Sequence, residues 1–242
     1  MLPSTSLNLR MSKRGNVVAL VVSVVLAGTG GIVAAQWRDI LPKRFGVVAE
    51  GKVYRSGELT PKAMRTIVEK YKIKTIIDLG ADEPGSADDL RAQRTADALG
   101  VTRFVFRDPS GGTVDGKPGN VLIGDATGNP NAYIQALRLM TDPSRQPVLV
   151  HCGAGTQRTG CAIILYRHII EGLPTKDAFP EAARFDHDPQ KNPLLTGMLE
   201  RWGEKIAAAY ANGSQIDDPD APKLAEPMPV PSVLKNGRGE KP

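Results

Sequence analysis

The chain has 242 residues, of which 41% are hydrophobic and 24% charged, and its formal net charge is +5 at pH 7. This length suits one well-packed domain with extra segments, and the two cysteines exclude a disulfide scaffold and a zinc-finger protein. A basic chain first suggests nucleic-acid binding, but residues 38–212 carry a balance of only +3, without a dense basic run. We therefore expect no nucleic-acid partner.

The first predicted element is an apolar segment near the N-terminus. No charged residue occurs between Gly15 and Trp37. Residues 17–35 nearly supply the about 20 apolar residues that a membrane-spanning helix needs. A cleaved secretory signal is the alternative, with the small residues at 33–35 as its cleavage site. We predict that residues 1–37 form a basic flank and a transmembrane anchor, or else a signal peptide.

Basic residues flank this apolar segment almost evenly, with Arg10, Lys13 and Arg14 before it and Arg38, Lys43 and Arg44 after it. The distribution of positive charge therefore does not by itself set the orientation of an anchor. The N-terminal flank is similar to an export signal, and long domains cross the membrane largely regardless of their charge. We expect the folded domain on the extracytoplasmic side.

Strand and helix patterns alternate over residues 38–212, which we predict to be one domain. Short apolar runs bounded by turn residues predict strands at 53–56, 74–79, 103–106 and 148–150. Helical patterns occur at 61–71, 86–99, 130–141 and 193–211. Three of these helices begin with a capping residue followed by proline, at Thr60-Pro61, Asn129-Pro130 and Asn192-Pro193. The alternation predicts an α/β fold with a central, mostly parallel sheet flanked by helices.

The C-terminal segment, residues 213–242, has a different composition. It contains six prolines and no apolar periodicity. Such a segment cannot bury enough apolar surface to offset the cost of ordering it. We predict a disordered, Pro-rich tail.

The segment at 148–160 has a pattern typical of an anion site. A buried strand runs into a glycine-rich turn that opens directly into an apolar helix. Such a turn points successive N–H groups inward, and the helix adds the positive end of its dipole. Cys152 lies at the start of the turn, where this field favours the thiolate form. Arg158 offers a planar fork for two phosphate oxygens, and the Thr159 hydroxyl can donate to the sulfur.

The sequence His151-Cys152, five further residues, and then Arg158-Thr159-Gly160 resembles the active-site loop of cysteine-based protein tyrosine phosphatases. The VYRSG segment at 53–57 and the TIIDLG strand at 75–80 resemble the bacterial dual-specificity-type branch of that superfamily. The resemblance covers roughly residues 45–185.

The resemblance implies a two-step reaction that needs neither a metal nor another cofactor. Cys152 attacks phosphorus, an acid protonates the leaving oxygen, and water then hydrolyses the phosphocysteine. His151 is implied to support Cys152 from behind. The implied phosphate-binding residues are Gly153, Ala154, Gly155, Thr156, Gln157, Arg158 and Thr159.

In the family the acid is an aspartate on a loop upstream of the strand that leads to the cysteine. The candidates are Asp108, Asp115 and Asp125. We favour Asp125, which lies 27 residues before Cys152 and shortly before the predicted helix start at Asn129. Asp108 directly follows a strand and is the second choice, ahead of Asp115 or a reaction without a side-chain acid.

Two further features are expected to be structural. Cys161, in the first turn of the helix after the loop, is predicted to be a small core residue that forms no disulfide with Cys152. His187 lies between two aspartates, which is too few ligands for a metal site.

The sequence thus predicts a phosphatase for phosphomonoesters of the phosphotyrosine and phosphoserine/threonine class. Its substrate is expected to be a phosphorylated protein or a small phosphomonoester. The expected location is the bacterial inner membrane, as a single-pass protein with a periplasmic domain; the cytoplasmic face and secretion are the alternatives. A lipid or inositol phosphate is an alternative substrate, although residues 153–157 carry no lysine for a polyphosphate. A catalytically dead phosphate-binding module is the alternative from another class.

Overall fold

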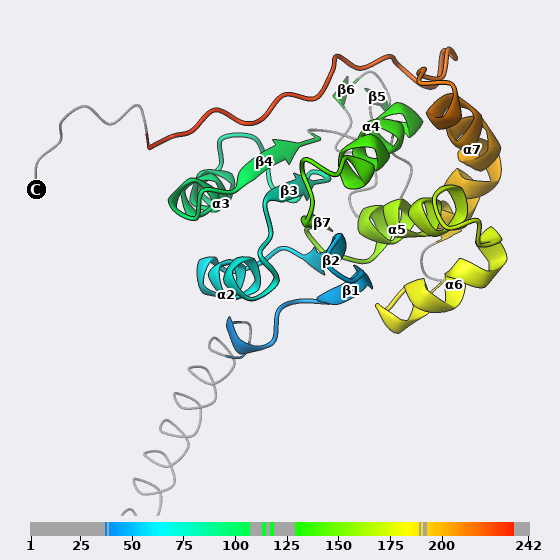
Figure 1. The fold of residues 1–242 in the computed structure, drawn as a ribbon. Coiled ribbons are helices and arrows are strands. Elements are labelled where there is room, and N and C mark those ends of the chain that lie inside the picture. Colours follow the sequence, from blue (N-terminus) through cyan, green and yellow to red (C-terminus); the bar gives the residue numbers. More distant parts are fainter. Residues whose placement is uncertain are drawn as a thin grey trace, which may run out of the picture.

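The structure is a computed structural model, and it describes residues 37, 39–106, 113–114, 117–118, 129–188, 190 and 193–234. Five strands form a central sheet in the order β1-β2-β7-β3-β4 (Figure 1). Their bounds are β1 (Gly46–Ala49), β2 (Val53–Gly57), β3 (Thr75–Asp78), β4 (Thr102–Val105) and β7 (Val148–Cys152). The short strands β5 (Thr113–Val114) and β6 (Lys117–Pro118) form a separate antiparallel pair.

Four of the five central strands are parallel, which confirms the predicted central sheet. β7 lies between β2 and β3 and is parallel to both, and β4 is parallel to β3. The fifth strand, β1, was not predicted; it pairs antiparallel with β2 and makes the sheet mixed. The carboxyl ends of β2, β7 and β3 therefore meet at one edge of the sheet, which is where ligands bind in open α/β sheets.

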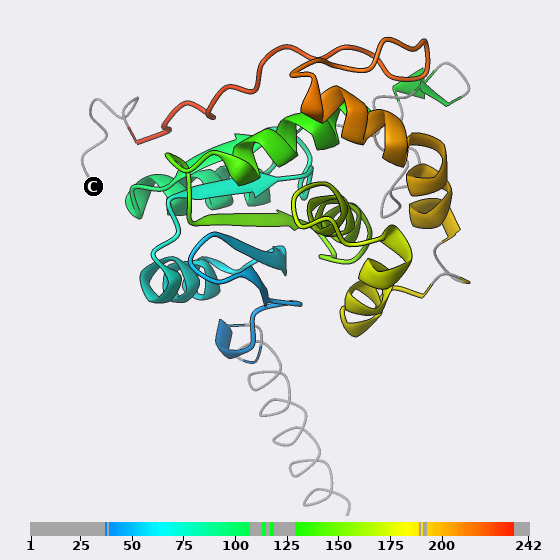
Figure 2. The ribbon, with the colours of Figure 1, turned by 45° about the vertical axis from the view of Figure 1, so that its right-hand side comes forward.

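Helices cover both faces of this sheet. Their bounds are α2 (Pro61–Tyr71), α3 (Ala87–Ala98), α4 (Pro130–Thr141), α5 (Gln157–Ile169), α6 (Thr175–Arg184) and α7 (Pro193–Ala211). α2 and α3 lie on one face, and α4, α5, α6 and α7 lie on the other (Figures 1 and 2). Two predicted caps are confirmed: Thr60 accepts the Ala63 N–H at the start of α2, and Asn129 accepts the Asn131 N–H at the start of α4.

Apolar side chains lie on both faces of the sheet because neighbouring residues of a strand point in opposite directions. On β3, Ile77 packs with α4, α5 and α7, whereas Ile76 packs with α2 and α3. On β7, Val148 and Val150 join the first cluster and Leu149 joins the second. The continuous apolar runs of these two strands thus fit the inner strands of a sheet covered on both faces.

Residues 213–234 differ from the predicted disordered tail, because they lie along the domain and hydrogen-bond to it (Figure 2). Asn131 of α4 is buried, and its Oδ1 accepts the Ile216 N–H at 2.7 Å. Farther along, the Val230 N–H donates to the Arg103 carbonyl of the edge strand β4 at 2.8 Å. Side-chain amides and an open strand edge supply the partners that the proline-rich sequence cannot supply to itself.

The predicted membrane segment at 17–35 and residues 235–242 lie outside the described residues. No helix in the described part of the chain is both long and apolar enough to cross a membrane.

Candidate active site

The segment that contains Cys152 begins at the centre of the sheet edge where the parallel strands end. Cys152, the last residue of β7, pairs with Gly57 at the end of β2, and His151 pairs with Asp78 at the end of β3. After a four-residue turn the chain enters α5 at Gln157. The predicted arrangement of strand, glycine-rich turn and helix is thus confirmed. We call residues 152–158 the Cys152 loop.

Glycine is required where the Cys152 loop touches β2. Gly155 has a φ of +77°, and a Cβ there would lie 2.5 Å from the Gly57 nitrogen. A Cβ on Gly57 would in turn lie 2.8 Å from the Ala154 oxygen. Because both contacts involve backbone atoms, the two segments can approach only as glycines. The close approach fixes the Cys152 loop against the end of β2.

Cys152 lies at the bottom of the loop, 2% exposed. The Gly155 N–H donates to its Sγ at 3.3 Å, so at least one loop amide points inward, as the sequence predicts. Thr156, at the N-cap of α5, makes no side-chain cap bond to the first turn of this helix. The first N–H groups of a helix have no partner within the helix, so the start of α5 offers donors to an anion.

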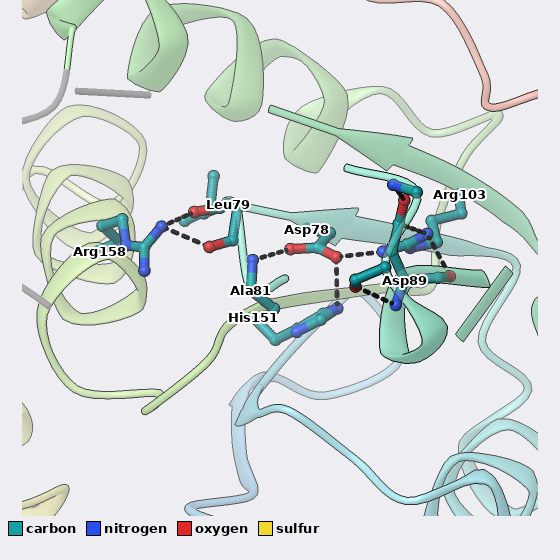
Figure 3. Close-up of polar contacts among 10 residues, drawn as sticks. Asp78, Leu79, Ala81, Asp89, Arg103, His151 and Arg158 are labelled. Carbon is teal, nitrogen blue, oxygen red and sulfur yellow. Dashed lines mark hydrogen bonds and ion pairs between the residues drawn. The ribbon is translucent and has the colours of Figure 1, made fainter. Parts of the chain in front are cut away.

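Arg158 and Thr159 lie in the first turn of α5. Arg158 Nη1 donates to the Leu79 carbonyl at 2.7 Å and to the Gly80 carbonyl at 2.5 Å, so the guanidinium reaches the end of β3 (Figure 3). Thr159 is fully buried, and its Oγ1 has no hydrogen-bond partner among the described residues. A hydroxyl with an unused donor in this turn fits the predicted contact with the sulfur.

A buried charge network lies behind the Cys152 loop (Figure 3). The Asp78 carboxylate is 0% exposed; it accepts from Arg103 Nη2 at 2.6 Å and from the Ala81 N–H at 2.7 Å. His151 Nε2 lies 3.8 Å from the same carboxylate. Arg103 also binds Asp89 at 2.8 Å. The prediction that His151 supports the loop from behind therefore fits its place in this network.

The contacts within this network, together with burial, determine the protonation states of Asp78 and His151. Burial alone would raise the pKa of Asp78, but the charge that His151 carries once protonated, the Arg103 charge and the Ala81 N–H lower it below its usual range. Burial lowers the pKa of His151 below its ordinary value, despite the attraction of Asp78. At neutral pH Asp78 is therefore ionised and His151 is neutral, so this histidine is suited to orient the loop and not to carry charge.

Three cationic side chains from outside the loop donate to three successive loop carbonyls. They are Lys43 Nζ to Gly153 at 2.8 Å, Arg44 Nη1 to Ala154 at 2.8 Å and Arg55 Nη2 to Gly155 at 2.5 Å. Burial lowers the pKa of Arg55 to about 10, which leaves it charged at neutral pH. The sequence analysis considered only residues 153–157, which carry no lysine, and did not predict these cations from outside the loop. Only Arg55 could have been suspected, as an arginine within a buried strand.

A cavity of about 300 Å³ lies between the start of α2 and α3, and its lining reaches His151, the residue before the Cys152 loop, but includes none of residues 152–158. Its lining includes the carboxylates of Glu58, Asp82 and Asp88 and the apolar side chains of Leu59 and Met64. Burial, together with the charges of Glu58, Asp78 and Asp88, raises the pKa of Asp82 to about 6. The cavity thus has three carboxylates and one arginine, Arg91, which pairs with Asp88. Lys43 lies close to the same region, because the Gly153 carbonyl accepts both from Lys43 Nζ and from the Glu58 N–H.

The three candidates for the general acid, Asp108, Asp115 and Asp125, lie outside the described residues. Within the described part of the chain, no group of three or more His, Cys, Asp or Glu side chains is placed to hold a metal ion.

Cys161 is a core residue, as predicted. It is fully buried and its Sγ lies 3.5 Å from the Met198 sulfur of α7. Burial raises the pKa of the Cys161 thiol far above its ordinary value, so it is a poor nucleophile.

We expect the substitution Cys161→Ala to leave kcat/KM within about twofold of the original value and to lower the free energy of unfolding by about 1–2 kcal/mol, through lost packing. Alkylation of the native protein with iodoacetamide should label one thiol in both forms, at Cys152. Loss of the labelled thiol in Cys161→Ala would show that Cys161 is the reactive cysteine.

The chain has relatives of known family and structure. Residues 39–212 match the sequence model described as the Tyrosine phosphatase family. The core catalytic domain of the PP-IP phosphatase SIW14 from S. cerevisiae is 25% identical, with a TM-score of 0.51 over 71% of this chain and 94% of that chain.

TpbA from P. aeruginosa is 17% identical, with a TM-score of 0.51 over 70% of this chain and 92% of that chain. Tk-PTP in its active form is 17% identical, with a TM-score of 0.50 over 68% of this chain and 99% of that chain. At such identities these two matches support the fold alone. No curated protein sequence matches the chain significantly.

The family match spans the whole domain, and the loop, the sheet edge and the helix start described above lie within it. The chain therefore belongs to the tyrosine phosphatase family, within the cysteine-based protein tyrosine phosphatase superfamily.

Proposed function

We propose that the chain hydrolyses phosphomonoesters of the phosphotyrosine and phosphoserine/threonine class through a phosphocysteine intermediate. One observation carries the proposal: the Cys152 sulfur accepts the Gly155 N–H at the base of a loop that ends at the start of α5. Backbone N–H groups and a helix start aimed at one point stabilise an oxyanion there. Arg158, six residues after Cys152, adds a charged fork.

In the proposed first step, the Cys152 thiolate forms a bond to phosphorus while the bond from phosphorus to the leaving oxygen breaks. The leaving oxygen takes a proton from the acid, for which we propose Asp125. In the second step, water attacks phosphorus and gives a proton back to the acid, and Cys152 leaves as a thiolate. Thr159 Oγ1, which has no partner among the described residues, is proposed to donate to the departing sulfur.

The proposal is tested by measuring the hydrolysis of an aryl phosphate in EDTA. We expect turnover without added metal. A panel of a phosphotyrosine peptide, a phosphoserine peptide and inositol phosphates then identifies the substrate class from the ratio of kcat/KM values. Tight binding of phosphate or tungstate without turnover of any substrate would favour the catalytically dead binding module instead.

The second candidate function is the hydrolysis of an inositol phosphate. It is favoured by the positive charge of Lys43, Arg44 and Arg55, which lies beside the loop although these side chains donate to loop carbonyls. The similarity to a yeast PP-IP phosphatase is consistent with it. The acidic lining of the cavity next to His151, with Glu58, Asp82 and Asp88, disfavours a substrate with several phosphates. We therefore place this function second.

We expect Asp125→Asn to lower kcat by a factor of about 100 to 1,000 on alkyl phosphates, whose leaving oxygen must be protonated. On p-nitrophenyl phosphate, whose leaving group departs as an anion, we expect a much smaller loss. Initial rates on both substrates test this, with Asp108→Asn and Asp115→Asn as matched variants. Equal losses of Asp125→Asn on both substrates would assign the acid to another residue.

We also propose, from the sequence alone, that residues 17–35 hold the protein in the bacterial inner membrane, with the domain in the periplasm. Fractionation of cells that express the full chain or a form without residues 1–37 tests the attachment. A reporter enzyme fused after residue 242 tests the orientation. Recovery of the full chain in the soluble fraction would contradict an anchor.

A further inference from the structure

Three successive carbonyl groups of the Cys152 loop accept hydrogen bonds from cations outside the loop, and this fixes the direction of the peptide groups. A trans peptide holds its N–H on the side opposite to its carbonyl oxygen. The carbonyls of Gly153, Ala154 and Gly155 all point to cations on the outer side of the loop. The N–H groups that follow them, at residues 154, 155 and 156, therefore point away from these cations. The Gly155 N–H, which donates to Cys152 Sγ, has this direction.

Two of these cations, Lys43 and Arg44, are adjacent in the chain and are held firmly in place. The Lys43 carbonyl accepts the Gly57 N–H at 2.7 Å, which ties this segment to the end of β2. Arg44 Nε donates to Asp186 at 2.8 Å while its Nη1 binds the loop. One side chain thus joins three segments that are far apart in the sequence.

The backbone at Arg44 supports a specific role for its side chain. Its φ is +48°, in the left-handed region that residues other than glycine and asparagine rarely adopt. Glycine or asparagine would adopt this conformation more easily, yet the position holds an arginine whose guanidinium reaches the loop. Such strain persists where surrounding contacts compensate for it, often at functional sites.

The third cation, Arg55, is 1% exposed and lies over the Phe185 ring, 3.8 Å from the ring centre. Among the described residues, Arg55 Nε and Nη1 have no hydrogen-bond acceptor. Burying a guanidinium in this way costs free energy, so we expect its charge to have a role. It donates to Gly155, the residue whose N–H faces the sulfur.

We propose that Lys43, Arg44 and Arg55 are positioning residues that hold the Cys152 loop in its anion-binding conformation. Each fixes one loop carbonyl outward and thereby aims the next N–H inward. A charged donor on the carbonyl also polarises the peptide and strengthens the N–H on its other side. This inference rests on the proposed role of the loop as an oxyanion site.

The test uses tungstate, an oxyanion that needs no turnover, and measures its dissociation constant by calorimetry. We expect the double variant Lys43→Met/Arg44→Gln to bind tungstate about tenfold or more weakly. The matched control, Lys62→Met/Arg65→Gln, also removes one lysine and one arginine charge, but from exposed positions on α2. It should change the tungstate affinity by less than about twofold. Arg44→Lys, which keeps a charged donor, should weaken binding less than Arg44→Gln does.

Tungstate affinity of the double variant equal to that of its control would overturn the proposal. So would equal affinities of Arg44→Lys and Arg44→Gln. Because Lys43 and Arg44 are only half-buried, we expect the variants to fold, and the single variants preserve the test if the double variant does not.

The positioning role and the proposed function can fail separately. If the chain hydrolyses no phosphomonoester but the double variant loses tungstate affinity, the positioning role holds and the proposed function is wrong. If the chain hydrolyses an aryl phosphate and the double variant binds tungstate normally, the function holds and the positioning role is wrong.

Discussion

The substitution Cys152→Ser is expected to lower kcat on an aryl phosphate by at least about four orders of magnitude. A serine hydroxyl is a weak nucleophile unless a base takes its proton. His151, the adjacent histidine, is buried and its Nε2 faces the Asp78 carboxylate, so it is poorly placed to serve as that base. The variant therefore keeps the shape of the site and loses its proposed nucleophile.

The same variant should bind tungstate at least as tightly as the original protein does. The proposed donors to the oxyanion are the loop N–H groups and Arg158, and the substitution leaves all of them in place. It also removes a negative charge from the base of the loop if Cys152 is a thiolate there. Calorimetry with tungstate and initial rates in EDTA measure the two quantities on one preparation.

Two outcomes would contradict a nucleophilic Cys152. One is a Cys152→Ser protein that retains more than about 1% of the original kcat, since a lost nucleophile costs far more. The other is a similar loss of kcat in Cys161→Ala, whose buried thiol contacts Met198 away from the loop. Cys161→Ala thus serves as the matched control for the removal of a thiol.

The Cys152 loop could be predicted from the sequence because its determinants are local. The apolar run before Cys152, the glycines after it and the apolar helix beyond are contiguous, so their pattern predicts both the turn and its anion-binding donors. The prolines that begin α2, α4 and α7 are local signals as well, and these helices begin where predicted. Local chemistry therefore determined most of the fold around the site.

The surroundings of the loop could not be predicted, because they depend on residues far apart in the chain. Lys43 and Arg44 were interpreted as charges flanking a membrane segment, whereas their side chains bind the loop 110 residues away. Net charge did not reveal the site either. The domain has only a small excess of positive charge, yet four of its cations lie in or beside the Cys152 loop: Lys43, Arg44, Arg55 and Arg158.

Among the elements that were not predicted, β1 and α6 were missed for different physical reasons. β1 is only four residues long, and its sequence GVVA shows no alternation of apolar and polar residues to mark a strand with one exposed face. α6 has Pro174 at its N-cap and Pro180 within it, and proline usually argues against a helix interior. Tertiary packing against α5 compensates for this weak local propensity.

Among the charged side chains of the described residues, those of the buried network behind the Cys152 loop should contribute most to the free energy of unfolding. We expect Arg103→Met to lower the free energy of unfolding by about 3–5 kcal/mol at neutral pH, because it leaves the buried Asp78 and Asp89 carboxylates without this cation. The control Arg65→Met breaks an exposed ion pair with Glu69 and should cost less than about 0.5 kcal/mol.

The destabilisation should depend on pH in a defined direction. In the original protein the pKa of His151 is lowered, so the unfolded chain takes up a proton that the folded protein refuses, and stability falls as the pH drops below the ordinary histidine value of about 6.5. The Arg103 charge is one cause of that low pKa. Without it, His151 can become protonated in the folded state and pair with Asp78.

Arg103→Met should therefore lose less stability on acidification than the original protein does, and the difference between the two should shrink from pH 7.5 to about pH 5.5. Urea unfolding at both pH values measures it. Arg103→Lys, which keeps one charge but not the fork that reaches both carboxylates, should fall between the two proteins. A difference that stays constant with pH would mean that the Arg103 charge does not lower the pKa of His151, and a cost below about 1 kcal/mol would show that solvent reaches the two carboxylates.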